Sequence, residues 1–166
     1  GVEVYSFAYT FGLPPIPLGF VVGNKEIIAG LQQAASILPV SVPSYYVDLA
    51  INAIRHFPGN GLKEVRRKID QSAAAAMPFL QALKLEKEGF DSVPFLWARI
   101  ERRSQATTAA GILYRKSRIL AAPGDVFGGN GEGYLRFSLT ATAENYREAL
   151  DRIKKKVKLS SLVKDR

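Results

Sequence analysis

The sequence predicts an α/β protein whose last part is a small α+β unit. Three patterns predict this. The chain opens on the alternating stretch "VEVYSFAY", its middle carries apolar residues at helical spacing, and the part after Gly89 shows the order strand, helix, strand, strand, helix. No internal repeat occurs, so a solenoid is excluded.

The first elements are two strands and a helix. Val2, Val4 and Ser6 alternate with Glu3, Tyr5 and Phe7, which is typical of a strand. "GFVVG" (19–23) is an apolar run between glycines and predicts a buried strand. The segment 24–38 then predicts a helix with Asn24 as its N-cap, which ends where Pro39 removes a backbone donor.

Two more helices follow in the middle of the chain. "VPSYYVDLAINAIRHF" places Tyr46 and Ala53 on one apolar stripe; this helix starts at Ser44 or Pro43, and "PGNG" ends it. From Leu62 to Leu83 the apolar residues predict one long helix, which Pro78 should kink or break.

The part after Gly89 has shorter elements. "SVPFLWARIE" predicts a strand, "QATTAAGILYRKS" a helix, "RILAAPGDVF" a strand that leads into a turn, "GYLRFSLT" another strand and "AENYREALDRIKKKV" a final helix.

Composition excludes several classes of protein. The 166 residues contain no cysteine, which excludes disulfides and cysteine-rich zinc sites, and we predict no metal site. The net charge is +8, but the basic residues interleave with acidic and aliphatic ones, so we expect solvated helix faces and no nucleic-acid partner. The apolar stretch 16–22 is too short for a membrane span and no secretory signal occurs. We expect a cytoplasmic protein, or one of an organellar matrix or stroma.

The order of several stretches resembles the C-terminal part of the class I and II aminotransferases, which are fold type I pyridoxal-phosphate enzymes. These stretches are "SFAYTFGLPPIPLGFVVGNKEII", "VPSYYVDLAINA", "FLWARI" and "PGDVFGGNGEGYLRFSLT". Their residue pattern is most similar to that of the aspartate and LL-diaminopimelate aminotransferases. The resemblance implies the C-terminal portion of the fold type I PLP-dependent transferase fold.

The resemblance also marks where the family holds its cofactor. The family has a serine, a lysine that forms an imine with pyridoxal phosphate, and an arginine that grips the phosphate. These places fall on Ser6, Tyr9 and Pro17. A phenol has no amine to condense and proline has neither charge nor donor, so only Ser6 is left as a vestigial cofactor contact. Ala8 replaces a further serine. We therefore predict no catalytic residue and no cofactor for this chain, with Lys25 the first substitute lysine to test.

Arg136 is the remaining candidate. The resemblance places it at the arginine that binds the substrate carboxylate; the alternative is an arginine on the solvent side of a strand, paired with a neighbour. Ser6 has an alternative too, a hydrogen bond within its own loop. The glycines of "GGNGEG" suit turn backbone, and His56 lies at a predicted helix end, where a structural role is expected.

The resemblance implies three parts: residues 1–38 as a remnant of the large cofactor domain, 39–86 as connecting helices, and 87–166 as the small domain. The start at Gly1, directly before a strand, is typical of a chain cut by processing, by design or by loss of an upstream half. We expect a degenerate, non-catalytic binding or assembly module, inactive alone, that self-associates or binds a protein through residues 1–50. The alternative is a fragment or subunit of an aminotransferase completed by a separate N-terminal part; a basic nucleic-acid accessory is a third.

Overall fold

The computed structural model describes residues 1–12, 17–38, 41–56, 59–88, 94–100 and 106–156. The chain divides into two compact units, Gly1–Val65 and Arg66–Arg166, which are here called the N-terminal unit and the C-terminal unit. The three-part division expected from the resemblance stays a prediction. In the described part of the chain, each helix is too short or too polar to cross a membrane.

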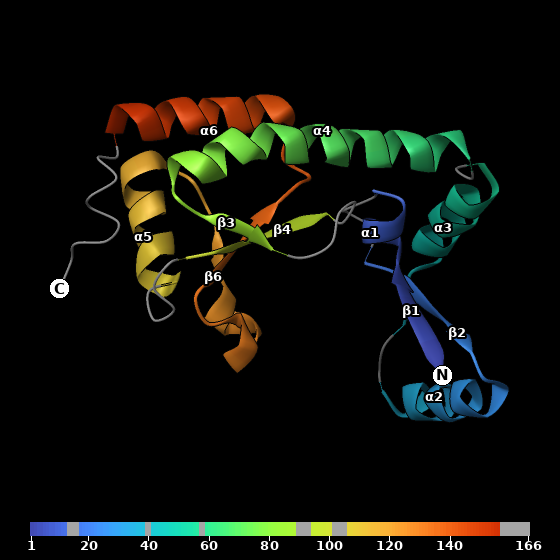
Figure 1. The fold of residues 1–166 in the computed structure, drawn as a ribbon. Helices are drawn as coiled ribbons and strands as arrows, with labels where there is room; N and C mark the ends of the chain where they lie inside the picture. The colour runs from blue at the N-terminus through green and yellow to red at the C-terminus, as the bar shows by residue number, and fades with distance from the viewer. Residues whose placement is uncertain (13–16, 39–40, 57–58, 89–93, 101–105, 157–166) are drawn as a thin grey trace. The chain divides into compact units, whose positions relative to one another are not determined.

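The N-terminal unit is built on a β-hairpin (Figure 1). Strand β1 (Val2–Ser6) pairs antiparallel with β2 (Gly19–Gly23), and Ser6 lies opposite Gly19. The predicted strand through Tyr9 is shorter in the structure, because the chain turns into the single helical turn α1 (Phe7–Thr10). The Phe7 backbone nitrogen donates to the Leu18 oxygen over 3.0 Å, which ties α1 to the start of β2.

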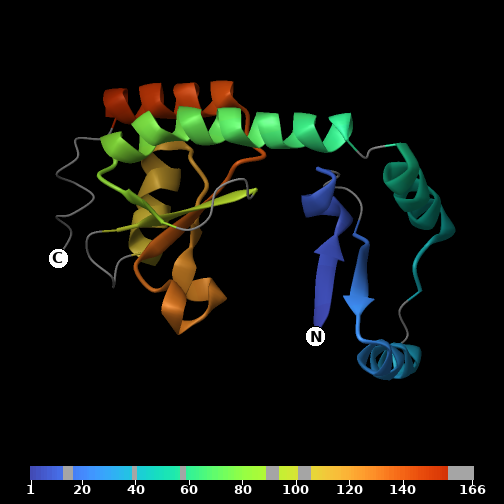
Figure 2. The same cartoon turned by 45° about the vertical axis from the view of Figure 1, so that its right-hand side comes forward.

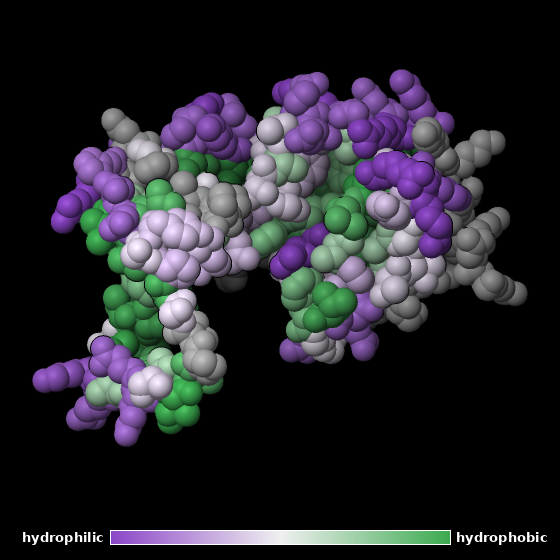
Figure 3. Space-filling view, turned by 180° about the vertical axis from the view of Figure 1, so that it is seen from behind, coloured by the Kyte–Doolittle hydropathy of each residue, from purple (hydrophilic) through white to green (hydrophobic). Residues whose placement is uncertain are grey.

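The expectation of a buried strand at residues 19–23 is wrong within the described structure. Val21 and Val22 are exposed, because the sheet of this unit has two strands and, within β2, only Phe20 packs against the small core around Phe7. Helix α2 (Lys25–Ile37) buries none of its residues, although its predicted cap is confirmed: Asn24 Oδ1 accepts from the Glu26 and Ile27 backbone nitrogens. Figure 3 shows the resulting apolar surface along the hairpin and α2.

The core of the N-terminal unit is small. Phe7, Phe11, Ala50 and Ala53 form it, the last two from α3 (Ser44–His56). Stacking of the Phe7 and Phe11 rings, with centroids 5.2 Å apart, fixes α1 against this core. The hairpin end at α1 is therefore the packed end of the unit.

Helix α4 (Asn60–Ala82) is the predicted long helix, but Pro78 does not end it. Proline removes the hydrogen bond to the carbonyl four residues earlier, which here belongs to Ala74. Ala74 is exposed, so water can satisfy that carbonyl. Ile69, Ala76, Leu80 and Leu83 are buried as the helical spacing predicts.

The C-terminal unit contains a four-stranded antiparallel sheet in the order β3-β4-β6-β5. Its strands are β3 (Glu86–Glu88), β4 (Phe95–Arg99), β5 (Ala122–Pro123) and β6 (Tyr134–Ser138). The strand expected from "RILAAPGDVF" is confined to Ala122–Pro123, since the chain then enters the 3-10 turns η2 (Gly124–Phe127) and η3 (Gly129–Gly131).

The two faces of this sheet differ. Leu96, Ala98, Leu135 and Phe137 are buried and define the inner face. Helices α4 and α6 (Ala143–Lys156) run side by side over the sheet, and α5 (Ala106–Ser117) stands at one end (Figures 1 and 2). The Phe79 ring of α4 packs edge-on against Phe137 and Tyr146 at 5.3 and 5.7 Å. The alternate residues of β4 and β6 form the half-exposed outer face.

Helices α4 and α5 are each followed by a cationic residue with a positive φ. Lys84 (φ 55°) and Arg118 (φ 56°) adopt the left-handed conformation just past each helix. The following amides of Leu85 and Ile119 donate back to the Leu80 and Leu113 carbonyls. At α4 this is the Schellman arrangement; at α5 the Arg118 amide donates to the Tyr114 carbonyl, which is the αL motif, and glycine is the usual residue in both.

Candidate functional site

The positions marked at the start of the chain lie together at the packed end of the hairpin. Ser6 ends β1 and is half-buried, Tyr9 lies in α1 with 55% of its surface exposed, and Pro17 is exposed just before Leu18. The hydrogen bond from Phe7 to Leu18 holds the two sides of this end together. The structure thus brings Ser6, Tyr9 and Pro17 to one place.

Lys25 lies at the opposite end of the hairpin. It follows Gly23, which pairs with Val2, whereas Tyr9 lies beyond the Ser6–Gly19 pair. Four steps along a strand span about 13 Å, which exceeds the length of a lysine side chain. Figures 1 and 2 show α2 and α1 at opposite ends of β1 and β2. Lys25 is therefore a poor substitute for the amine that Tyr9 lacks.

Arg136 belongs to the C-terminal unit, on the outer face of the sheet. Its guanidinium carbon lies 4.2 Å from the centre of the Phe95 ring and 4.4 Å from that of Phe127. Aromatic rings favour a cation over their faces, so these two contacts orient the guanidinium. No carboxylate in the described part of the chain forms an ion pair with Arg136. Its in-plane N–H groups are the kind that bind a carboxylate through two parallel hydrogen bonds.

Close contact between two glycines positions Phe127. A Cβ on Gly124 or on Gly131 would lie 2.0 Å from the carbonyl oxygen of the other residue, so only glycine fits at either position. Asp125 accepts a hydrogen bond of 2.7 Å from Thr107 Oγ1 of α5, which ties the η2 turn to that helix. The glycine-rich segment thus works as a packed support for Phe127.

Arg99 lies on the same outer face and gives a direct contrast. Its guanidinium pairs with Glu86 and, over 2.8 Å from Nε to Oε1, with Glu88. The hydrogen bond and charge of Glu86, followed by the charge of Glu88, raise the pKa of Arg99 above its ordinary value. Arg99 is therefore already engaged by carboxylates of its own unit, whereas Arg136 is held by aromatic rings.

A hollow of about 320 Å³ borders this face. Trp97, Phe127, Tyr134, Glu88, Asn130 and Gly131 line it. The Trp97 ring meets Phe127 and Tyr134 edge to face at 5.5 and 5.8 Å, and Tyr134 donates a 2.7 Å hydrogen bond to Glu88. Because Phe127 contacts both the hollow and Arg136, a ligand on the arginine would lie beside an aromatic wall.

The aromatic partners of Arg136 were missed from the sequence. Two signals were present: Phe95 and Trp97 alternate with the buried Leu96 and Ala98, and a strand partner is expected to bring such residues beside Arg136. For Phe127 no such signal existed, because its place depends on the contact between Gly124 and Gly131.

The family of the chain is shown by a match to a family model. The model for "Aminotransferase class I and II" matches residues 1–153. The chain belongs to this family. LL-diaminopimelate aminotransferase of Syntrophobacter fumaroxidans is 30% identical over 155 residues, covering 93% of this chain and 40% of the relative. Transaminase BacF of Bacillus subtilis is 28% identical over 159 residues, covering 93% of this chain and 39% of the relative.

The solved structures agree on the fold. The apo form of BacF from Bacillus subtilis matches with a TM-score of 0.78 at 24% identity, covering 93% of this chain and 40% of that one. An aminotransferase from Mycobacterium tuberculosis matches with a TM-score of 0.78 at 16% identity and similar coverage, 93% and 41%. The mixed α/β fold is therefore that of part of the fold type I aminotransferases. This chain spans about two fifths of the length of the relatives that it matches.

The residues at the hairpin end do not fit the aminotransferase cofactor in the family's manner. At the positions that the resemblance assigns to the imine-forming lysine and the phosphate-binding arginine, Tyr9 offers a phenol, and Pro17 offers neither a charge nor an N–H. Ser6 is the one of these three residues that matches the residue type that the resemblance assigns to its position. No group of metal-ligating side chains occurs among the described residues, and exposed His56 contacts the Asn52 carbonyl of its own helix at 3.1 Å.

Proposed function

We propose that this aminotransferase-family chain is a non-catalytic module that binds a carboxylate through Arg136. The observation that carries the proposal is the pair of ring contacts that orient this arginine without a carboxylate partner from the described residues. Orienting a guanidinium before a ligand arrives reduces the entropy lost on binding. The family assignment supports the choice of a carboxylate, since the resemblance places Arg136 at the carboxylate-binding arginine.

The same proposal excludes imine chemistry at the hairpin end. An internal imine needs a lysine, and the resemblance puts Tyr9 there, with Lys25 at the far end of the hairpin. Pro17 removes the phosphate clamp as well. The amine and the phosphate-binding cation are both missing because of residue type, so no rearrangement of the hairpin can supply them.

Fluorescence of Trp97 tests the carboxylate site, because it is the only tryptophan and contacts Phe127. Titration with succinate should change its emission in a saturable way. Arg136→Gln should weaken binding about 10- to 100-fold, since a hydrogen bond to a charged group contributes roughly 1.5–3 kcal/mol. Arg99→Gln is the matched control on the same face and should bind succinate as the unchanged protein does. Equal binding by the Arg136 variant and the unchanged protein would contradict the proposal.

A borohydride trap tests the absence of an imine. The purified chain is incubated with pyridoxal phosphate, dialysed, reduced and analysed by mass spectrometry. We expect no stoichiometric adduct, because weak imines at surface lysines have no built pocket and are lost on dialysis. A single stoichiometric adduct on the unchanged chain contradicts the non-catalytic assignment and its mapped position identifies the lysine.

We further propose that residues 1–50 form an assembly surface. Among its described residues, Val4, Val22, Ile27 and Leu31 are exposed, although residues 13–16 and 39–40 lie outside the described part. An exposed strand edge beside apolar side chains favours pairing with another chain. Light scattering should show a dimer or larger species, and Val4→Lys with Val22→Lys should shift it towards monomer. A monomer at all concentrations, with no co-purifying protein, would contradict self-association and partner binding alike.

A second candidate is a subunit of an aminotransferase that a separate N-terminal part completes. The observation that favours it is the coverage, since the chain matches about 40% of each relative. Co-expression with the N-terminal part of the Syntrophobacter relative tests it. A stable complex with transaminase turnover favours this candidate, whereas a stable complex without turnover favours the assembly module.

A further inference from the structure

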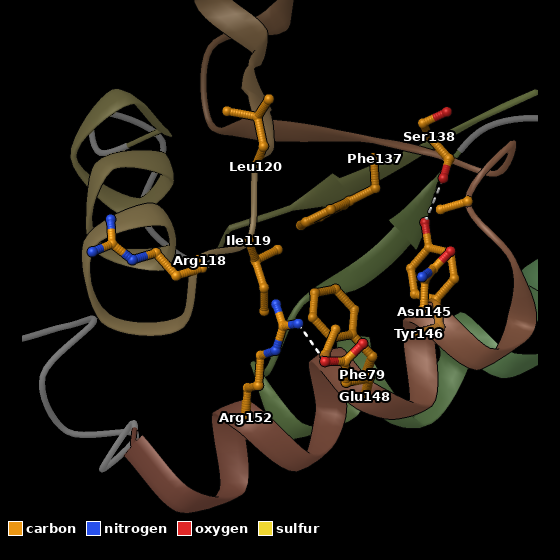
Figure 4. Close-up of a pocket in the computed structure, with 12 residues that line it drawn as sticks. Phe79, Arg118, Ile119, Leu120, Phe137, Ser138, Asn145, Tyr146, Glu148 and Arg152 are labelled. Carbon is orange, nitrogen blue, oxygen red and sulfur yellow. Dashed lines mark hydrogen bonds and ion pairs between the residues drawn. The ribbon is translucent and has the colours of Figure 1, made fainter.

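A second hollow lies on the inner side of the C-terminal sheet, between α6 and the segment that follows α5 (Figure 4). Its volume is about 210 Å³. Phe79 and Phe137 contribute aromatic rings to it, and Ile119 and Leu120 contribute aliphatic side chains. Successive residues of a strand point to opposite faces, so Phe137 and Arg136 face away from each other. This hollow, called the α6 pocket below, is separate from the carboxylate site at Arg136.

Leu120 is the least expected residue of the α6 pocket. It is 83% exposed, although leucine side chains stabilise a fold by being buried. The hydrogen bond from Ile119 to the Leu113 carbonyl fixes the backbone just before it. Leu120 lies at the rim of the hollow, where a ligand that extends out of the hollow would cover this side chain.

The charged groups of the pocket favour an anion. Arg152 directs its guanidinium between Ile119 and Phe79, and its Nη2 donates to Glu148 (Figure 4). The remaining N–H groups of Arg152 have no acceptor in the described part of the chain. Arg118 adds a second positive charge near the hollow, although its guanidinium turns back over Tyr114. With two arginines and one glutamate, the lining carries a net charge of +1.

The opposite end of the pocket offers another donor. Asn145 Oδ1 accepts hydrogen bonds from the Thr142 nitrogen and hydroxyl, at 3.0 and 2.8 Å. Its amide nitrogen makes no hydrogen bond to the described residues. Polar donors at both ends and apolar side chains between them suit a ligand with an acceptor group and an apolar body.

We propose that the α6 pocket binds a small monocarboxylate with an apolar body. The carboxylate pairs with Arg152, and the body lies against Phe79, Phe137 and Leu120. The volume corresponds to about seven water molecules at roughly 30 Å³ each, which suits one ring or a chain of about six to eight carbons.

Calorimetry on the whole chain tests the ligand class with cyclohexanecarboxylate as the probe. Acetate has the charge without the body, and cyclohexanol has the body without the charge. We expect saturable binding of the probe in the millimolar range and at least tenfold weaker binding of both comparison compounds. Equal binding of cyclohexanol, or no saturable binding of the probe, would overturn the proposal.

Substitutions on α6 test the location. Arg152→Gln should weaken binding of the probe about tenfold or more. The matched control is Arg147→Gln, since Arg147 lies on the same helix and pairs with Glu144 in the same way but does not line the pocket. Ala149→Leu should abolish binding by filling the hollow. Unchanged binding in both pocket variants would contradict the proposal.

Two further variants separate this site from folding and from Arg136. Leu120→Ser should weaken binding without lowering the melting temperature, because this side chain is exposed in the free protein. Arg136→Gln should leave binding of the probe unchanged. If Arg136→Gln abolishes binding of both succinate and the probe, the α6 pocket is refuted while the carboxylate site stands; loss of succinate binding alone supports both.

Discussion

The hairpin end and the outer face of the second sheet both carry positions that the aminotransferase resemblance marks as functional, but they differ in their side chains. The hairpin end has a phenol at Tyr9 and a ring at Pro17, at the positions where the resemblance places a lysine and an arginine. The outer face has Arg136 between two aromatic rings.

The difference shows which parts of a site are also parts of the fold. The hairpin is held by backbone pairing of β1 with β2 and by the core around Phe7, so replacing the side chains at Tyr9 and Pro17 leaves both intact. Arg136 packs against Phe95 and Phe127 and therefore contributes to the outer face itself. Side chains at the hairpin end can therefore be replaced while the hairpin stays folded, whereas replacing Arg136 also removes its packing against two aromatic rings.

The largest effect is expected from Gly131→Ala, which breaks the support of the outer face. The new Cβ would lie 2.0 Å from the Gly124 oxygen, and overpacking of this kind costs roughly 1–3 kcal/mol or more. Urea unfolding should show this loss, and succinate binding should weaken as Phe127 shifts. Gly129→Ala is the control, because nothing lies within 4 Å of its added carbon. Equal stability of the two variants contradicts the role given to this contact.

A second prediction concerns the C-terminal unit and the pH dependence of its stability. Burial raises the pKa of Tyr146 to about 12, above the value near 10 of an unfolded chain. Between these values the folded protein keeps the phenolic proton that the unfolded chain loses. Stability from Tyr146 is therefore fully present below about pH 10 and falls by roughly 2–3 kcal/mol as the pH rises to 12.

The substitution Tyr146→Phe tests this predicted loss of stability between pH 10 and 12. The variant loses the hydrogen bond to the Ser138 oxygen, which costs about 1 kcal/mol at neutral pH. Urea unfolding at pH 8, 10 and 12 should show the stability difference between the two proteins shrinking and reversing. A constant difference across this range would show that burial of Tyr146 does not control its ionisation.

A smaller effect is expected when one ring is removed from Arg136. Phe127→Leu keeps an apolar side chain but removes the aromatic face, which contributes roughly 0.5–1 kcal/mol to an exposed contact of this kind. Succinate binding should weaken about two- to fivefold by Trp97 fluorescence. Val126→Ala, in the same turn and 67% exposed, should change nothing. Unchanged binding in Phe127→Leu would remove Phe127 from the site.

The smallest effect is expected at the hairpin. Tyr9→Lys supplies an amine, but Pro17 provides no phosphate clamp, so we expect no stoichiometric pyridoxal-phosphate adduct after dialysis and reduction. The comparison is Tyr9→Lys combined with Pro17→Arg, which supplies both groups. A stable adduct in the single variant would mean that the hairpin end keeps more of a cofactor site than its residues indicate.

The helices and most strands of the C-terminal unit were predicted from the spacing of their apolar residues. This spacing was informative because the elements that bury those residues belong to the same chain. Strand β3 was missed since its residues "EKE" carry no apolar alternation, and pairing with β4 alone makes it a strand. The predicted burial of "GFVVG" failed for the opposite reason: its apolar residues indicate a covered sheet, but the described core reaches only Phe20 of this strand.

The candidate site was predictable in part. Arg136 was singled out by resemblance, and the structure adds the rings that orient it. Pairing between β4 and β6 brings Phe95 near, but Phe127 reaches Arg136 through a turn whose shape depends on glycine contacts. Long-range contacts between loop backbones have no periodic signature, so only the folded chain reveals them.

The cationic residues that end α4 and α5 make those ends sensitive to ionic strength. Lys84 and Arg118 hold a backbone conformation that is costly for any side chain, but each places a positive charge at the negative end of a helix dipole. Salt screens that attraction and leaves the backbone cost unchanged. Concentrated salt buffers should therefore loosen the two helix ends, one of which leads into the mouth of the α6 pocket.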